Sequence, residues 1–409
     1  MKNITARRTR ILCISTLLSL FSAQGAWQLD PEKSEEFRGR DGLPNVFSKI
    51  EAGQPVRIAY FGGSITYAGG WRPKTLAWFR EQFPRTEFSE INAAIPGTGS
   101  NYGACRLKED VLQHKPDLVF VEFRVNGGGG FEQQSIEGIV RQIWRDNPQA
   151  DICFAYTLGI WMLKDLQAER NTTFGETMES TANHYGIPSI DFGLDIAKRE
   201  QAGTLIFKAD KPEKGKFLFS NDGVHPTDDG HQIYSEIVAR SMLKMSDQRH
   251  PLEHELVQPM NETCWETATL LPITEAHLSA GWSSVDERKD PVYNSDAQRT
   301  KAMLRGAVKC NREGETITVK WNGTNIALSD IPHGGTIVIE AVVDGKTVAV
   351  TERKQTEMSR KFARFWHIPE QPPGEHEIVF TIKQLPEGTS FYAGQLLVIG
   401  TPTRQVGTE

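Results

Sequence analysis

The sequence is poor in cysteine, in long apolar runs and in basic charge. Its 409 residues contain five cysteines, and their spacings match no CxxC or zinc-binding pattern, which argues against a metal site. The formal net charge is −6, so the chain lacks the basic surface with which proteins bind nucleic acids or anionic membranes. Beyond the amino terminus, no apolar run is long enough to span a membrane. Repeats and low-complexity segments are also missing, and the composition is that of an ordinary globular protein.

The amino terminus has the features of a secretory signal peptide. Four positively charged residues precede an apolar run over residues 11–21, and small residues follow it. Cleavage is expected near Gly25, so residues 1–25 are predicted to be removed and the protein to be secreted or periplasmic. The removed segment carries four positive and no negative side chains, so the mature chain has a net charge of −10.

The length of the chain favours two domains, because it exceeds what one compact core usually organises. Residues 26–250 are predicted to form the first. Apolar strand-like segments alternate there with segments of helical periodicity, which predicts a parallel sheet covered by helices on both faces. The expected strands are 56–62, 87–95, 117–125, 151–159 and 187–193, and the expected helices are 71–83, 102–115, 131–147, 175–186 and 230–245.

The pattern changes after about Pro251 to strands of alternating polarity. Segments 315–328 and 336–350 contain Asn322-Gly323 and Asp344-Gly345, which are typical of hairpin turns. No helix is expected among these strands. Residues 251–409 are therefore predicted to form an all-β sandwich or jelly roll.

Four cysteines remain after signal cleavage, namely Cys105, Cys153, Cys264 and Cys310. A secreted protein can form disulfides. Cys264 and Cys310 are the expected pair, since both fall in the second domain.

A serine directly follows the first predicted strand. Gly62 and Gly63 permit a sharp turn after the apolar segment 56–61, and Ser64 comes next. In an open α/β sheet, ligands bind beyond the carboxyl ends of the strands, so a serine presented there is a candidate nucleophile. Taken alone, the pattern favours the N-cap of a helix.

Three more loops carry polar residues at comparable positions. They are 92–100 and 122–130, which follow strands, and 221–231, which precedes the last helix. Loops at the carboxyl ends of parallel strands gather at one edge, so their side chains can share a pocket. There, His225 is the candidate general base for Ser64, and Asp222 would hold the other ring nitrogen.

An oxyanion formed during serine attack needs hydrogen-bond donors. The candidates are the backbone amides of Ser64 and Gly97 and the side-chain amide of Asn126. Considered alone, Asn126 is more typical of a turn, and Gly97 is equally typical of a glycine that only shapes its loop. His231 is the rival base, but its position favours a helix-start residue. The order and placement of the four loops together favour a serine-based acyl-transfer site.

These segments resemble the conserved blocks of the SGNH/GDSL hydrolase family. "GGSIT" is similar to the first block with glycine in place of the aspartate of GDS, and "NAAIPGTGS", "VNGGGG" and "DGVHP" are similar to the second, third and fifth. The likeness covers roughly residues 55–245. It implies a flavodoxin-like three-layer α/β/α fold without metal or organic cofactor. It implies roles for five residues: a triad of Ser64, Asp222 and His225, and an oxyanion hole of Ser64, Gly97 and Asn126.

The chain departs from that family after Asn126. Glycine stands where many relatives carry aspartate, and the run 127–130 is expected to leave the loop more mobile.

The resemblance leaves the substrate open, because one fold hosts many activities. A secreted, acidic enzyme joined to a β-sandwich resembles carbohydrate esterases, so we expect a serine esterase that removes acyl groups, in the first place acetyl, from a carbohydrate or polysaccharide. Tyr67, Trp71 and Trp161 are candidates for stacking on sugar rings. The alternatives are a lipolytic esterase or thioesterase for small acyl esters, and a carbohydrate-binding protein with an idle site. The intact triad argues against the idle site.

Overall fold

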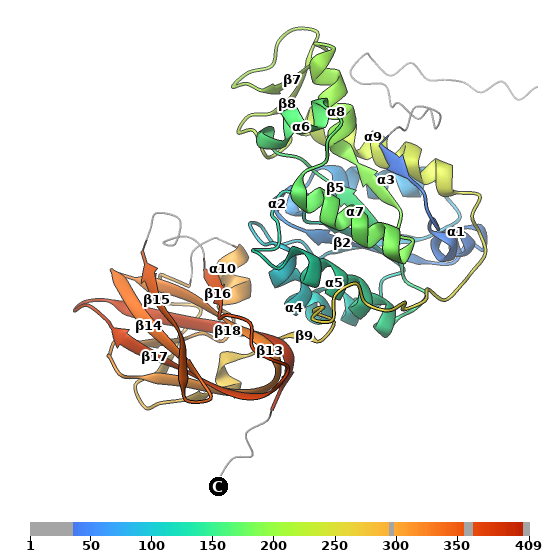
Figure 1. Ribbon diagram of the computed structural model, residues 1–409. Coiled ribbons are helices and arrows are strands. Elements are labelled where there is room, and N and C mark those ends of the chain that lie inside the picture. The colour runs from blue at the N-terminus through green and yellow to red at the C-terminus, as the bar shows by residue number, and fades with distance from the viewer. Residues whose placement is uncertain (1–35, 294–297, 356–362, 404–409) are drawn as a thin grey trace, which may run out of the picture.

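A computed structural model describes residues 36–293, 298–355 and 363–403 of the chain. It contains an α/β domain, followed in sequence by an antiparallel β domain that lies against one side of it (Figure 1). The predicted signal peptide, residues 1–25, lies outside the described residues.

The α/β domain is built on a six-stranded sheet in the order β1-β6-β5-β4-β2-β3. All of its strands pair in parallel except β1, which runs antiparallel to β6. Every residue of β4 and β5 is buried, which explains why these segments read as continuous apolar runs. The six strands are β1 (Phe37–Arg38), β2 (Val56–Gly62), β3 (Phe88–Asn92), β4 (Leu118–Glu122), β5 (Asp151–Tyr156) and β6 (Ser189–Asp191).

Helices cover both faces of this sheet. One apolar core unites a face of the sheet with α1 (Pro44–Glu51), α3 (Trp71–Gln82), α8 (Phe192–Gln201) and α9 (Asp228–Met245). A second core unites the other face with α4 (Ser100–Asp110), α5 (Glu132–Asp146) and α7 (Thr173–Tyr185). The predicted three-layer α/β/α fold is thus confirmed. Within the described residues, no helix has both the length and the apolarity needed to cross a bilayer.

Some elements of this domain were not expected from the sequence. The last strand was predicted to reach residue 193, but β6 ends at Asp191, whose carboxylate accepts a hydrogen bond from the Gly193 amide and caps α8. The sequence also gave no expectation for α1, for the short α6 (Leu163–Gln167), or for the parallel pair β7 (Leu205–Lys208) and β8 (Phe217–Ser220).

The β domain is an antiparallel sheet of ten strands that encloses its own apolar core, as predicted for a β-sandwich. The turn at Asp344-Gly345 joins β14 to β15, as expected. The strands are β9 (Ala268–Leu271), β10 (His277–Leu278), β11 (Ser283–Ser284), β12 (Val308–Cys310), β13 (Thr316–His333), β14 (Thr336–Val343), β15 (Lys346–Lys354), β16 (Arg364–His367), β17 (Gly374–Gln384) and β18 (Ser390–Pro402).

Two expectations for this domain were wrong. Asn322-Gly323 is not a hairpin turn, because β13 continues through it with a bulge beside β18. The backbone of β18 comes so close there that a Cβ on Gly323 would lie 2.0 Å from the Ile399 carbonyl oxygen. A helix is also present, α10 (Gln298–Met303), at the edge that faces the α/β domain (Figure 1).

The predicted disulfide between Cys264 and Cys310 is also absent, since both thiols are free. Cys264 lies on the segment between the domains, whose backbone is fixed beside it by a hydrogen bond from the Trp265 amide to the Gln134 carbonyl on α5. Cys310 belongs to the core of the β domain, where its sulfur accepts from the Arg312 amide. The two cysteines therefore belong to different packing units.

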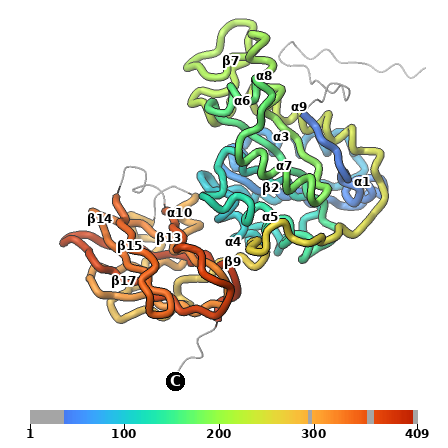
Figure 2. The backbone as a smooth tube through the Cα atoms, viewed as in Figure 1, coloured from blue at the N-terminus to red at the C-terminus, as the bar shows by residue number. Residues whose placement is uncertain are grey.

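The segment between α9 and β9 is bound firmly to the α/β domain. In Figure 2 it appears as the yellow tube that passes beside α5 before it reaches β9. Arg141 of α5 pairs with Glu266 at 2.6 Å and donates to the Val257 carbonyl. Trp265 is fully buried, and its ring centroid lies 4.8 Å from that of Phe131 and 5.2 Å from that of His367. Trp265 thus joins both domains into one apolar core.

We expect Trp265→Ala to lower the free energy of unfolding by about 3–5 kcal/mol, because it leaves a cavity where the two domains meet. Equilibrium unfolding in urea measures the effect. Trp161→Ala is the matched control, since that indole is 57% exposed, and it should change stability by less than about 0.5 kcal/mol. Equal effects of the two substitutions would contradict this role of Trp265.

Candidate active site

Ser64 lies at the point where β2 gives way to the short helix α2 (Ser64–Tyr67). Gly63 is the N-cap of this helix, and no side chain caps it. The interpretation of Ser64 as an N-cap is therefore wrong. Gly63 is required at this turn because a Cβ there would lie 2.0 Å from the Oδ1 atom of Asn126. The turn leaves the Ser64 hydroxyl pointing toward the loop before α9.

That loop supplies the two partners predicted for Ser64. The Ser64 hydroxyl lies 2.8 Å from Nε2 of His225, and Nδ1 of His225 lies 2.6 Å from Oδ2 of Asp222. The side chains of His225 and Asp222 are about half exposed, at 48% and 54%. The structure therefore brings the three residues into a continuous hydrogen-bonded line at the surface of the domain.

The two oxygens of Asp222 have different partners. Oδ2 contacts the His225 ring, whereas Oδ1 accepts from the backbone amides of Val224 and His225, both at 2.8 Å, and from the Ser220 hydroxyl at 3.0 Å. Partial burial disfavours the charge, but these hydrogen bonds outweigh it and hold the pKa of Asp222 well below its ordinary value. Asp222 is thus a carboxylate that fixes both the loop and the imidazole.

The residues predicted for the oxyanion hole lie on adjacent loops. Gly97 follows β3 and has a φ of +69°, a conformation that favours glycine. Its loop is joined to the end of β2 by a hydrogen bond of 3.0 Å from the Ile95 amide to the Gly62 carbonyl. Asn126 follows β4, and its side chain lies directly against Gly63. The structure therefore gathers the loops of Gly97 and Asn126 around the turn that carries Ser64.

The glycine run after Asn126 is held by hydrogen bonds. The Glu132 carboxylate accepts from the amides of Gly128 and Gly130, both at 3.2 Å. The Gly127 carbonyl accepts from the Ser100 amide at 2.9 Å, which ties the run to the start of α4. These contacts constrain the loop that was expected to be mobile.

A buried carboxylate lies beneath the nucleophile turn. Glu122, the last residue of β4, is completely buried and accepts from the hydroxyls of Thr66 at 2.8 Å and Thr157 at 2.5 Å. Burial raises its pKa to about 7, although the two hydroxyls and the Gly63 amide oppose the shift. Glu122 thus connects the ends of β2, β4 and β5 behind Ser64.

The three aromatic residues proposed to contact substrate differ in exposure. Tyr67 is 40% exposed at the end of α2, and Trp161 is 57% exposed. Trp161 follows Ile160, whose amide donates to the Gly223 carbonyl in the His225 loop. Trp71, in contrast, is fully buried and packs edge-on against Tyr60, so the prediction that it binds substrate is wrong.

His231, the rival base, is buried and serves the fold. Its Nδ1 accepts a hydrogen bond of 3.1 Å from the Trp71 amide at the start of α3. Burial lowers the pKa of His231 to about 4, which keeps the imidazole neutral as this acceptor requires.

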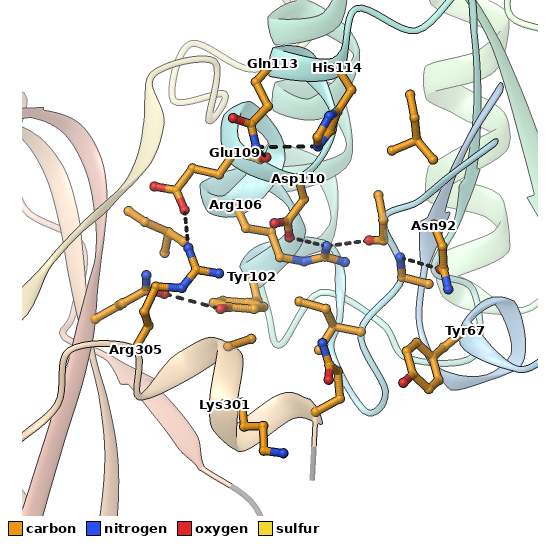
Figure 3. Close-up of a pocket in the computed structure, with 18 of the residues that line it drawn as sticks. Tyr67, Asn92, Tyr102, Arg106, Glu109, Asp110, Gln113, His114, Lys301 and Arg305 are labelled. Atoms are coloured by element: carbon orange, nitrogen blue, oxygen red, sulfur yellow. Dashed lines mark hydrogen bonds and ion pairs between the residues drawn. The ribbon is translucent and has the colours of Figure 1, made fainter. Parts of the chain in front are cut away.

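A cleft of about 700 Å³ lies between the two domains and extends to Tyr67. Figure 3 shows side chains of α4 entering it from one wall and Lys301 of α10 at the opposite wall. Most of the side chains that line it are polar or charged, among them Asn92, Arg106, Glu109, Asp110, Gln113, His114, Glu287, Lys301 and Arg305. Such a lining suits a polar ligand better than an acyl chain.

Four supporting residues were not found from the sequence: Glu122, Glu132, Ser220 and Arg299. Arg299 lies on α10 of the β domain, yet its guanidinium donates to the Gly97 carbonyl at 2.6 Å. Ser220 carried a local signal, because it precedes the Asp222–His225 segment directly. Glu132 also acts locally, on the amides of Gly128 and Gly130. Glu122 and Arg299 depend on contacts between distant segments. In the described part of the chain, no three His, Cys, Asp or Glu side chains cluster as a metal site would need.

Comparison with known proteins gives one family match. The model of the GDSL-like Lipase/Acylhydrolase family matches residues 60–233. A search of the curated proteins finds no match to the sequence.

Two solved structures resemble almost the whole chain. Both are crystal structures of a two-domain esterase (CEX) active on acetylated mannans, and each is 19% identical to this chain. The structure co-crystallized with mannopentaose has a TM-score of 0.71 and covers 92% of this chain and 99% of that one. The other has a TM-score of 0.72 and covers 91% and 100%. At this identity the likeness concerns the fold, which includes both domains.

Glu122→Gln should change how stability depends on pH. The pKa of Glu122 in the folded protein, about 7, lies above its unfolded value, so the folded state retains a proton that the unfolded state releases. Folding of the wild type therefore weakens as the pH rises from about 5 to about 7, by about 2 kcal/mol relative to the glutamine variant. Urea unfolding of both proteins at several pH values measures this difference. A difference that does not vary with pH would contradict the assignment.

Proposed function

Residues 60–233 belong to the GDSL-like lipase/acylhydrolase family, and from that premise we propose that the protein is a secreted serine esterase that removes acyl groups from a carbohydrate. The observation that carries the proposal is the hydrogen-bonded line from Ser64 through His225 to Asp222. The contact from Ser64 to His225 measures 2.8 Å, an ordinary hydrogen-bond length, and that from His225 to Asp222 is shorter, at 2.6 Å.

The chemistry follows from this line. His225 accepts the proton of the Ser64 hydroxyl as the oxygen attacks the ester carbonyl, and Asp222 stabilises the imidazolium that forms. The amides of Ser64 and Gly97 and the side chain of Asn126 donate to the oxyanion of the tetrahedral intermediate. His225 then protonates the departing sugar hydroxyl. Water hydrolyses the acyl-enzyme by the same steps in reverse order.

A sugar substrate is supported by the form of the site. The side chains of His225 and Asp222 are about half exposed, which leaves this side of the site accessible to a bulky hydrated chain. The polar cleft extends to Tyr67, on the same short helix as Ser64. The esterase that shares the two-domain fold acts on acetylated mannans, which makes acetylated manno-oligosaccharides the first substrates to test. A lipolytic or thioesterase activity toward small acyl esters is the second candidate, since the same triad would perform it. The proposal includes secretion, which is supported by the signal-peptide features of residues 1–25.

We expect Ser64→Ala to reduce kcat for an aryl acetate by roughly a million-fold, to background, while the thermal unfolding midpoint stays within a few degrees. Hydrolysis of 4-nitrophenyl acetate and acetate release from acetylated manno-oligosaccharides measure the activity. Full activity of the folded variant would refute the serine mechanism. A wild type that binds glycans but hydrolyses no ester would instead favour the idle binding protein.

Trp161→Ala should separate sugar binding from chemistry. If the exposed indole stacks on a sugar ring, its loss raises KM for acetylated oligosaccharides by roughly 2- to 10-fold. The aryl acetate has no sugar, so its kinetic constants should remain unchanged. Steady-state kinetics with both substrates measure the contrast, and an equal change for both would argue against sugar stacking by Trp161.

A further inference from the structure

The β domain contributes one side chain directly to the loop of the predicted oxyanion hole. Arg299 lies on α10 of that domain, and its guanidinium donates to the Gly97 carbonyl at 2.6 Å. The contact joins residues about two hundred positions apart in the chain. A Cβ placed on Gly97 would lie only 3.1 Å from the same guanidinium nitrogen, so the arginine lies close against this glycine.

The electrostatic setting of Arg299 is unusual. Among the described residues no carboxylate pairs with it, and its buried Nε has no hydrogen-bond partner. Burial, together with the charge of Arg364, lowers the pKa of Arg299 to about 10, so the side chain stays a cation at neutral pH. A partly buried cation that has no carboxylate partner among the described residues costs stability unless polar groups compensate it. In the described part of the chain, the Gly97 carbonyl accepts a hydrogen bond from this guanidinium.

Arg299 completes the restraint of the loop that follows β3. On one side, the Ile95 amide is bound to the Gly62 carbonyl, and the Thr98 hydroxyl donates to the Ile95 carbonyl at 2.8 Å. Gly97 lies between these two anchors in an exposed position with positive φ. Glycine has the widest backbone freedom of any residue, so its orientation is fixed only if another group holds it.

We propose that Arg299 is a positioning residue through which the β domain orients Gly97 for oxyanion stabilisation. The inference rests on the proposed esterase function and deepens it, because it makes the β domain part of the catalytic apparatus. By holding the Gly97 carbonyl, the guanidinium restrains the backbone of the residue whose amide is the predicted oxyanion donor.

The first test is kinetic and uses the full-length protein with 4-nitrophenyl acetate. Arg299→Met should lower kcat about 10-fold or more and leave KM within about twofold, because an oxyanion donor acts in the transition state. Arg299→Lys, which retains a cationic donor, should restore part of the loss. Arg145→Met is the matched control. It removes a guanidinium contact away from the Gly97 loop, that with Glu266 of the interdomain segment at 2.8 Å, and it should leave kcat unchanged.

The second test does not depend on activity. Amide hydrogen exchange of the segment 94–99 should be faster in Arg299→Met than in the wild type, and unchanged in Arg145→Met. Faster exchange in Arg299→Met, combined with a wild type that shows no Ser64-dependent hydrolysis, would retain the positioning role and refute the esterase function. A wild-type esterase whose Arg299→Met variant keeps kcat and loop protection would overturn the inference alone. A rise in KM with kcat unchanged in Arg299→Met would also overturn the inference, because it would assign Arg299 to substrate binding.

Discussion

Parallel pairing of β2 with β3 on one side and β4 on the other is the constraint on which the site depends. Because the three strands run in one direction, the loops that follow them leave the sheet at the same edge. Ser64, Gly97 and Asn126 follow β2, β3 and β4 in that order, so strand pairing alone brings them together. The hydrogen bond from the Ile95 amide to the Gly62 carbonyl then joins neighbouring loops.

The sequence was sufficient to predict the residues that lie at the carboxyl edge of the parallel sheet. Ser64 and Asn126 could be identified because each directly follows an apolar strand, and Asp222 and His225 because they lie together in a short turn before α9. Residues fixed by contacts between distant segments could not be predicted. Glu122 looks like one more residue of a strand, and only the folded sheet places Thr66 and Thr157 on its carboxylate.

The errors have a common physical origin, since local pattern cannot report tertiary contact. Trp71 begins a helix near the site, but the helix turns its indole into the core. Asn322-Gly323 has the sequence of a turn, yet its pairing with β18 keeps the strand continuous. Cys264 and Cys310 follow the domain boundary in sequence but belong to separate packing units. The position of α10, and with it that of Arg299, depends on how the two domains meet.

The interface gives the β domain a direct contact with the Gly97 loop. Trp265 holds the segment between the domains against α5, and α10 reaches the Gly97 loop. The central claim, however, is that Ser64 is the nucleophile, and covalent labelling tests it most directly. Incubation with a 4-nitrophenyl phosphonate, followed by peptide mass spectrometry, should find one adduct on Ser64, which His225→Ala should suppress. An adduct on another residue, or none in folded wild-type protein, would contradict the claim.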